Sequence, residues 1–195
     1  MFLSKLTLNR INRQAMRLLG DFYSLHKAVM SGFEAYREHT RVLFRIEPEE
    51  RDGVVHILVQ SKVKPSWALP GVVNSQVKEV HPAFHQGGKL WFRLRANPTV
   101  TRNGKRYGLV RDQSLEEWLR KKEKNLGVQF HSMSIVDEGY ITGSRGKESH
   151  RLNLKTALYD GLLTVTDAQL LEKSLTQGIG PGKAFGCGLL SLARG

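Results

Sequence analysis

Apolar residues along the first part of the chain change from an alternating pattern to a helical one. Residues 2–9 (FLSKLTLN) alternate loosely, as in a β-strand. From Asn12, a residue type suited to an N-cap, apolar side chains recur at steps of three and four as far as Gly32. The pattern predicts a strand followed by one long amphipathic helix.

Two β-rich runs follow this helix, at 41–47 (RVLFRIE) and 54–62 (VVHILVQSK). A proline, an aspartate and a glycine between them are turn formers, so the two runs predict a hairpin. We expect a further strand over 77–84, after a short helix. The resulting order, β-α-β-β-α-β, is that of the ferredoxin-like motif.

The same order of patterns begins again near Lys89. A strand starts there and bends at Pro98. The next pattern predicts a helix with Ser114 as its N-cap, Glu117 completing a capping box, and Gly127 as its end. The remaining predicted elements are two strands, a helix capped by an aspartate and a last strand, at 128–141, 150–166, 168–177 and 188–193.

We therefore predict an α+β fold made of tandem ferredoxin-like (RRM-like) β-α-β-β-α-β halves with a C-terminal glycine-rich loop. The predicted domains are 1–86 and 87–195. Modules of the RRM type stack RNA bases on aromatic side chains of the sheet, which a K/R-G-F/Y-G/A-F run signals. This chain has no such run. We expect any RNA to bind elsewhere than on the usual stacking face.

Charge is the compositional feature that bears most on function. The chain has 30 Lys and Arg against 18 Asp and Glu, a net charge of +12, and a sequence pI near 10.0. Such a field attracts nucleic acid, anionic membranes or acidic proteins. No apolar run approaches the roughly 20 residues of a membrane-spanning helix. Lys5 and Arg10 also interrupt the apolar start, so we expect a cytoplasmic protein with no membrane partner.

Basic residues gather in two predicted loop regions. Charge runs are usually solvated surface, but two of them beside turn residues on a strongly basic chain also fit contacts to phosphates. The candidate RNA-binding residues of the two regions are Arg102, Lys105, Arg106, Arg145, Lys147, Arg151 and Lys155.

Five glycines fall within the eleven residues 178–188. A backbone with so few side chains can approach a phosphate closely, and Gly180, Gly182 and Lys183 are the candidates for such contact. The loop is not a Walker A loop, because Ala184 stands where Ser or Thr is needed. Loops of this kind also serve as tight structural connections, and the residues alone leave both roles open.

Tyr23 and His26 are three residues apart in the first predicted helix and so share one face. Measured from Phe22 at 100° per residue, they fall at about +100° and about +40°, at the edge of the apolar stripe. This periodicity favours a core-edge histidine beside a partly buried tyrosine. The pair also fits acid–base chemistry, because histidine titrates nearest neutrality and tyrosine can donate a proton. Lys27 is adjacent and could offset phosphate charge.

The other histidines show no H-x-x-x-H or H-E-x-x-H spacing, and no paired acidic motif indicates a two-metal nuclease. The single cysteine, Cys187, cannot form an internal disulfide. We therefore expect no metal and no cofactor. A nuclease without a metal would use a nucleophile that the substrate supplies, and the 2′-OH that can do so implies RNA.

Four stretches of the chain resemble one protein family. They are FLSKLTLN at the start, the Tyr23-Ser-Leu-His26 helix, FRLRANPTVT (92–101) and QGIGPGKAFGCGLLSLA (177–193). They are similar to the CasE (Cse3) endoribonucleases of type I-E CRISPR systems. The resemblance spans nearly the whole chain and is weakest over 34–88.

The resemblance implies a protein that binds the stem-loop of a CRISPR repeat in precursor RNA and cuts once at its 3′ base. His26 would assist attack by the 2′-OH or protonate the leaving 5′ oxygen, and Tyr23 would position or protonate. The products would carry a 2′,3′-cyclic phosphate and a 5′-OH. The guide RNA would stay bound, with the protein joining other Cascade subunits in antiviral defence. The alternative is a non-catalytic RNA-binding scaffold subunit.

Overall fold

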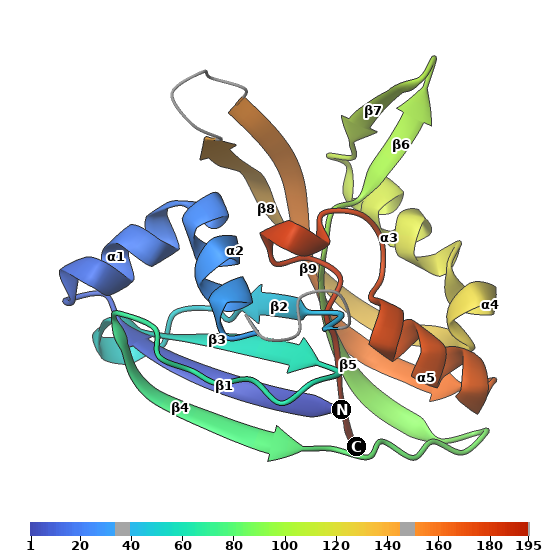
Figure 1. Cartoon of the computed structure of the whole chain (residues 1–195). Coiled ribbons are helices and arrows are strands. Elements are labelled where there is room, and N and C mark those ends of the chain that lie inside the picture. The colour runs from blue at the N-terminus through green and yellow to red at the C-terminus, as the bar shows by residue number, and fades with distance from the viewer. Residues whose placement is uncertain (34–39, 145–150, 195) are drawn as a thin grey trace. The chain divides into compact units, whose positions relative to one another are not determined.

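The computed structural model describes residues 1–33, 40–144 and 151–194, and the chain forms two compact units (Figure 1). The first unit contains Met1–His81, Thr142–Leu152 and Lys183–Gly186. The second contains Pro82–Ile141, Asn153–Gly182 and Cys187–Gly195. Residues 183–186 of the glycine-rich loop are therefore part of the first unit, and the rest of the loop belongs to the second. The domain boundary at 86/87 stays a prediction.

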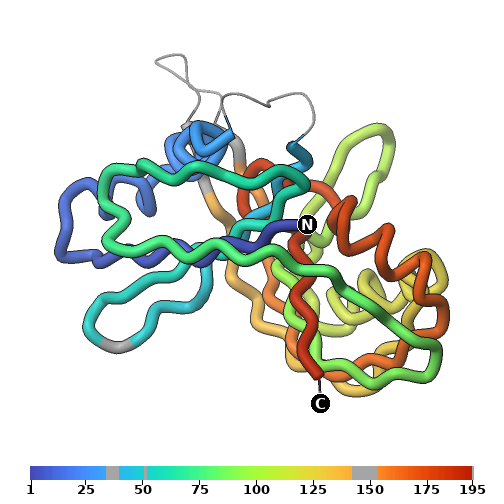
Figure 2. Tube along the Cα trace, turned by 60° about the horizontal axis from the view of Figure 1, so that its bottom comes forward, coloured from blue at the N-terminus to red at the C-terminus, as the bar shows by residue number. Residues whose placement is uncertain are grey.

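The first unit is built on a four-stranded sheet in the order β2-β3-β1-β4, with two helices on one face (Figure 1). Its strands are β1 (Phe2–Asn9), β2 (Leu43–Ile46), β3 (Val54–Ser61) and β4 (Val72–Glu79), with a short 3₁₀ turn, η2 (Arg51–Gly53), before β3. All three strand pairs are antiparallel. Figure 2 shows β4 running beside β1. The hairpin predicted after the first helix is confirmed as β2 and β3.

The long helix predicted from Asn12 to Gly32 is two helices, α1 (Arg13–Gly20) and α2 (Phe22–Ser31). Both predicted ends are confirmed, because the Asn12 side chain caps α1 and Gly32 is the C-cap of α2. Asp21 divides the two helices: its backbone is extended (φ −138°, ψ 111°), and its carboxylate caps α2. The apolar period continues across the break, which is why it predicted a single helix.

The apolar core of the first unit lies between its sheet and α2. Leu6 and Leu8 of β1 and Leu25 and Val29 of α2 are all at most 1% exposed. Burying one such side chain contributes about 1.5–3 kcal/mol. The core therefore fixes α2 on the sheet and determines which edge of the helix remains accessible.

The second short helix predicted for the first half does not form. Residues 62–71 contain no helix, and Pro65 and Pro70 each remove a backbone donor that a helix would need. The strand expected over 77–84 is also displaced, since β4 occupies Val72–Glu79 and ends before Pro82.

The second unit repeats the plan with a four-stranded sheet in the order β10-β5-β9-β8. Its elements are β5 (Lys89–Ala96), β6 (Thr99–Arg102), β7 (Lys105–Gly108), α3 (Asp112–Arg120), α4 (Glu123–Leu126), β8 (Val128–Ser144), β9 (Arg151–Val165), α5 (Ala168–Gln177) and β10 (Leu190–Arg194). Strands β6 and β7 form a separate two-stranded hairpin. In both sheets the strand that opens the half lies between that half's third and fourth strands. The predicted α+β fold with tandem ferredoxin-like halves is confirmed.

Helix boundaries in the second half are partly as predicted. Ser114 is not an N-cap, because α3 begins at Asp112 and its cap residue, Arg111, makes no side-chain capping bond. Gly127 ends α4 in the left-handed conformation, as expected. Asp167 caps α5 by accepting hydrogen bonds from two backbone N–H groups at 3.0 Å. None of the helices in the described residues is long and apolar enough to cross a membrane.

Candidate active site

The first turn of α2 is held in place by its cap. The Asp21 carboxylate accepts hydrogen bonds from the backbone N–H of Tyr23 at 3.3 Å and of Ser24 at 3.0 Å, and from the Ser24 hydroxyl at 2.6 Å. Leu25, which lies between Ser24 and His26 in the sequence, is buried in the core. This combination of cap and core anchor places Tyr23 and His26 on one edge of the helix, as their spacing predicted.

His26 packs against a buried aromatic ring. Its imidazole stacks on Phe44 of β2, with ring centroids 6.5 Å apart and an interplanar angle of 27°. Burial lowers the pKa of His26 below its ordinary value of 6.5. A neutral imidazole has one nitrogen free to accept a proton, so this environment favours a histidine that acts as a base near neutral pH.

Tyr23 is half-buried and has a cation beside it. The ammonium of Lys27 lies 4.7 Å from the centroid of the Tyr23 ring. The two side chains are one turn apart on α2, so this contact holds the exposed lysine along the edge that also carries His26. A positive charge at this edge would attract a phosphate.

Residues 183–186 of the glycine-rich loop lie against the same elements. Residues Lys183–Phe185 form a short 3₁₀ turn, η3, that contacts both α2 and β2. A Cβ added at Gly186, whose φ is +78°, would lie 3.3 Å from the Phe44 ring. The loop therefore reaches the ring on which His26 stacks, although more than half of the chain separates them in sequence.

Lys183 and Arg41 add positive charge to this part of the first unit. Burial lowers the pKa of Lys183, and the nearby positive charge of Arg41 lowers it further. Within the described residues, neither side chain forms an ion pair with a carboxylate. Two cations held near each other repel, and a bound anion such as a phosphate would relieve that repulsion.

Gly180 and Gly182 have a structural reason to be glycine. Their φ angles are +74° and +81°, in the region that side chains disfavour. A Cβ at Gly180 would lie 3.0 Å from Trp118, and one at Gly182 would lie 2.8 Å from Leu154. Both positions are thus constrained by the backbone and by packing in the second unit, and their predicted RNA contacts stay a prediction.

The first predicted basic region forms the β6–β7 hairpin. Arg102, Lys105 and Arg106 are all exposed there. The turn between the strands is Asn103-Gly104, with φ of 50° and 74°, and Asn-Gly is a strong hairpin signal that the sequence pattern contained. The three cations are open to a polyanion.

The second predicted basic region is described only in part. Arg145 and Lys147 lie outside the described residues, as does the side chain of Arg151, the first residue of β9. Lys155 is 4% exposed, and its ammonium donates a short hydrogen bond to Asp137. This bond is the main cause that lowers the pKa of Asp137. Because Lys155 is buried and paired with Asp137, it could reach an RNA only by leaving that carboxylate, and its contact with RNA stays a prediction.

No group of three or more His, Cys, Asp or Glu side chains that could hold a metal ion occurs in the described part of the chain. Cys187 is fully buried, and burial raises the pKa of its thiol to about 12. This thiol is therefore protonated at neutral pH and belongs to the packing of the second unit.

Known proteins match this chain over its whole length. A family model described as CRISPR associated protein matches residues 1–194. The chain belongs to this family. It is 34% identical to the CRISPR-associated endoribonuclease Cse3 of Thermus thermophilus, over 99% of this chain and 100% of that relative. It is 32% identical to the CRISPR system Cascade subunit CasE of Escherichia coli, over 89% and 92% of the two chains. The predicted relation to the CasE (Cse3) proteins is confirmed.

Solved structures of CasE (Cse3) proteins have the same fold. Cse3 bound to a 19-nucleotide RNA matches with a TM-score of 0.89 at 31% identity, covering 100% of both chains. Thermus thermophilus Cse3 bound to an RNA representing a pre-cleavage complex matches with a TM-score of 0.86 at 32% identity, covering 99% and 98%. Cas6e of Escherichia coli matches with a TM-score of 0.76 at 30% identity, again over both whole chains.

Two residues of the candidate site were not predicted from the sequence. Arg41 carried no motif, and Phe44 looked like an ordinary core residue of a strand. Their roles depend on long-range packing, which brings η3 and α2 to the same strand. Only a signal that Lys183 lies close to the first half of the chain in the folded protein could have indicated Arg41 and Phe44.

Proposed function

We propose that this chain is an endoribonuclease that needs no metal, binds the hairpin of a CRISPR repeat in precursor RNA, and cleaves at the 3′ base of the stem. The observation that carries the proposal is His26, which stacks on Phe44 and has a lowered pKa, on a helix that contacts the Lys183–Phe185 turn of the glycine-rich loop. The relatives support RNA as the substrate class. One is named an endoribonuclease, and a matching structure holds RNA in a pre-cleavage complex.

In the proposed reaction the 2′ oxygen attacks the adjacent phosphorus, and the bond from phosphorus to the 5′ oxygen breaks. His26, held neutral by burial, accepts the proton from the 2′-OH. Tyr23 or the resulting imidazolium donates a proton to the leaving 5′ oxygen, and a proton returned from His26 restores Tyr23 if it was the donor. The products are a 2′,3′-cyclic phosphate and a 5′-OH, and no water is consumed.

Charge builds on the phosphate oxygens as the 2′ oxygen attacks. Lys183, with Arg41 beside it, supplies positive charge in the unit that carries His26. Lys27 adds a further cation on the helix edge. Preorganised cations that meet charge where it develops lower the barrier more than cations that must first reorganise.

The E. coli relative is named a Cascade subunit. We accordingly propose that the product RNA stays bound and that this chain joins other Cascade subunits. The exposed Arg102, Lys105 and Arg106 are the described residues best suited to hold the RNA stem, because a duplex RNA is recognised mainly through its shape and phosphates. A cytoplasmic location is part of this proposal.

The proposal is tested by incubating the purified protein with repeat hairpin RNA in a chelator and mapping both new ends. We expect one cut, with a cyclic phosphate upstream and a hydroxyl downstream. The matched RNA with a single 2′-deoxy substitution at the scissile nucleotide should bind equally well and remain uncut. Cleavage of the deoxy RNA, or dependence on added metal, would contradict the mechanism.

The stacking of His26 on Phe44 also suits a purely structural histidine, which keeps a non-catalytic scaffold as the second candidate function. His26→Ala separates the two. An enzyme should lose about 10²- to 10⁴-fold in cleavage rate, as expected for loss of a general acid or base, and still bind the deoxy hairpin. His81→Ala is the matched control in the same unit, since that side chain is 80% exposed. Unchanged processing by His26→Ala would favour the scaffold.

A further inference from the structure

The sheet of the second unit has one face that is not packed into its core. Side chains alternate along β5, so Phe92 and Leu94 point into the core, where they are at most 3% exposed. Lys89, Trp91 and Arg93 point to the opposite face. Trp91 is 52% exposed there, which makes it the most accessible of the chain's three tryptophans in the described residues.

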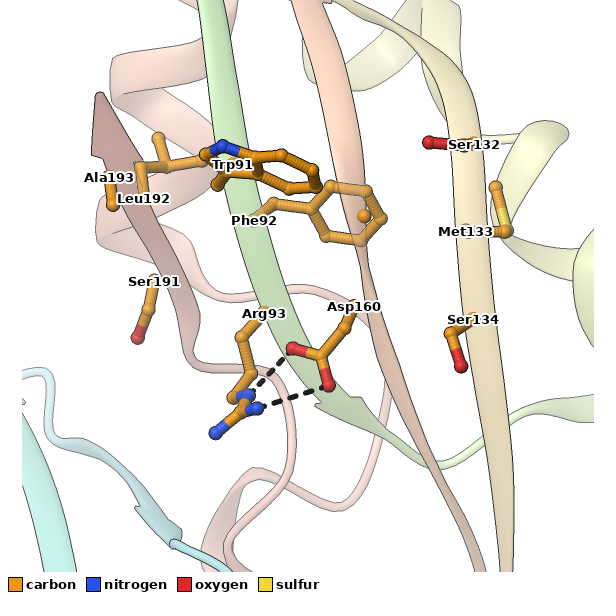
Figure 3. A pocket seen from close by; sticks show the side chains of 11 residues that line it. Trp91, Phe92, Arg93, Ser132, Met133, Ser134, Asp160, Ser191, Leu192 and Ala193 are labelled. Atoms are coloured by element: carbon orange, nitrogen blue, oxygen red, sulfur yellow. Dashed lines mark hydrogen bonds and ion pairs between the residues drawn. The ribbon is translucent and has the colours of Figure 1, made fainter. Parts of the chain in front are cut away.

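This face is hollowed and carries a mixture of apolar and polar groups (Figure 3). The hollow has a volume of about 600 Å³ and is lined by Trp91, Arg93, Asp160, Ser132, Ser134 and Ser191, among others. Residues from four strands thus contribute to one surface. A hollow of this size is within the range that accommodates a small organic group such as a nucleobase.

An ion pair fixes the centre of the surface. Arg93 donates from Nε to one oxygen of Asp160 at 2.6 Å and from Nη2 to the other at 3.2 Å, as the dashed lines of Figure 3 mark. Both side chains remain more than a third exposed. The pair joins β5 to β9, and the guanidinium is held in a fixed orientation two residues from Trp91.

The charge on this face favours an anionic occupant with flat rings. Arg93 is paired with the one carboxylate of the hollow, Asp160, and Lys89 adds a second cation at the start of the same strand. The apolar part of the lining is the exposed indole of Trp91 with Phe92, Met133, Leu192 and Ala193 around it. The hydroxyls of Ser132 and Ser134 on β8 can donate to or accept from base edges. Stacking on an aromatic ring combined with contacts to cations is how proteins hold single-stranded nucleic acid.

We propose that this face binds a single-stranded segment of the RNA substrate, outside the hairpin, with one base stacked on Trp91 and its backbone near Lys89. The inference rests on the proposed function, since it takes RNA as the ligand. The sheet has the strand order of an RRM-like module, and β5 and β9 are its two central strands. Because the chain has no RNP1-type run, we expected this face of the sheet to bind no RNA. Such a run, however, signals aromatic side chains on only one of the two central strands, and Trp91 lies on the other, β5.

The test compares two RNAs that carry the same 2′-deoxy hairpin and the same nucleotides 3′ of the scissile position. One begins at the stem, and the other has an unstructured single-stranded 5′ extension. Wild-type protein should bind the extended RNA about 5- to 100-fold more tightly, the effect of stacking about one base. Trp91→Ala should abolish this difference, and Trp91→Phe should keep most of it. Val73→Ala, at another exposed apolar side chain (62%) on the sheet of the first unit, is the matched control.

Cleavage of the hairpin with native ribose separates this inference from the proposed function. Trp91→Ala should cut that short hairpin at the wild-type rate; if wild-type protein does not cut it, the proposed function fails by itself. Equal affinity of wild type for both RNAs, or an extension effect that survives Trp91→Ala, overturns the inference. Loss of assembly with Cascade subunits, with the extension effect unchanged, would identify a protein interface and also overturn it.

Discussion

His26 and Phe44 form a stacked pair, with their ring centroids 6.5 Å apart and their planes at 27°. Phe44 is 1% exposed and belongs to the core of the first unit, on the edge strand β2. A buried apolar ring therefore lies beside the imidazole. The depressed pKa of His26 follows from this burial.

The first prediction concerns the pH dependence of cleavage. If neutral His26 is the base, single-turnover cleavage falls on the acid side with an apparent pKa below 6.5, because protonation removes the acceptor. Phe44→Leu should admit water beside the imidazole ring and so raise the apparent pKa of the acid limb toward 6.5. Phe33→Leu is the control, since Phe33 is equally buried in the same core but packs on Trp67. Superimposable acid limbs for Phe44→Leu and wild type would contradict this account.

The first prediction extends to folding stability, because the same depressed pKa of His26 also makes stability depend on pH. Between the lowered folded value and 6.5, the unfolded chain binds a proton at His26 that the folded chain does not. The contribution of His26 to the free energy of unfolding is therefore fully present above pH 6.5. It is lost as the pH falls through the pKa that His26 has in the folded chain. Urea unfolding at several pH values should show a shallower loss of stability below pH 6.5 in His26→Ala than in wild type.

Local signals predicted much of the fold, but long-range packing decided the site. The caps at Asn12 and Asp167 and the stop at Gly127 depend on neighbouring backbone groups, so the sequence predicted them correctly. The break at Asp21 was missed because the apolar period runs through it. The contact between η3 and α2 joins distant segments, and no local pattern encodes such a contact.

Arg41 illustrates the same limit. Its φ of 38° is uncommon for a residue other than glycine, and nothing in RVLFRIE indicated that its first residue would leave the strand. The strand begins at Leu43 instead, and the positive charge of Arg41 acts on Lys183. The sequence thus predicted the lysine of the loop but not the arginine near it.

The second prediction tests these two cations. Lys183→Gln should slow cleavage by about 10²-fold, the range for loss of one preorganised charge-stabilising group, with a smaller change in affinity for the deoxy hairpin. Arg41→Gln should slow it less, because Arg41 is more exposed, and Lys183→Arg should retain most activity. Single-turnover rates measure the effect, with the exposed Lys173→Gln on α5 as a charge-matched control. If Lys183→Gln cleaves at the wild-type rate, the loop has no role in the mechanism.

The third prediction uses the cap that divides the helices. Asp21→Ala removes the acceptor for the first turn of α2 and should cost about 1 kcal/mol of folding stability, whereas Asp21→Asn should cost little. Cleavage should also fall in Asp21→Ala, because that turn carries Tyr23. Asn12→Ala provides the comparison, as it removes the cap of α1 and should lower stability similarly without slowing cleavage. Equal effects of both alanines on cleavage would mean that the cap does not position the site.

The fourth prediction separates two residues that looked alike in the sequence. Arg106 is exposed on the β6–β7 hairpin, whereas Lys155 is buried against Asp137 with its ammonium 5.2 Å from the Tyr140 ring. Arg106→Gln should reduce the salt dependence of hairpin binding by about one unit of slope, since it removes about one phosphate contact, and should leave urea stability unchanged.

Lys155→Met should lower folding stability and leave the salt dependence of hairpin binding unchanged. The methionine keeps the apolar stem but leaves the Asp137 carboxylate without its cation, and breaking a buried pair costs about 3–5 kcal/mol. Because Asp137 keeps 33% of its side chain exposed, water can compensate part of this loss, and we expect the lower end of that range or slightly less. The salt slope of RNA binding should not change. A reduced slope in a stably folded Lys155→Met protein would show that Lys155 leaves Asp137 to meet the RNA, and would restore the contact that its burial argues against.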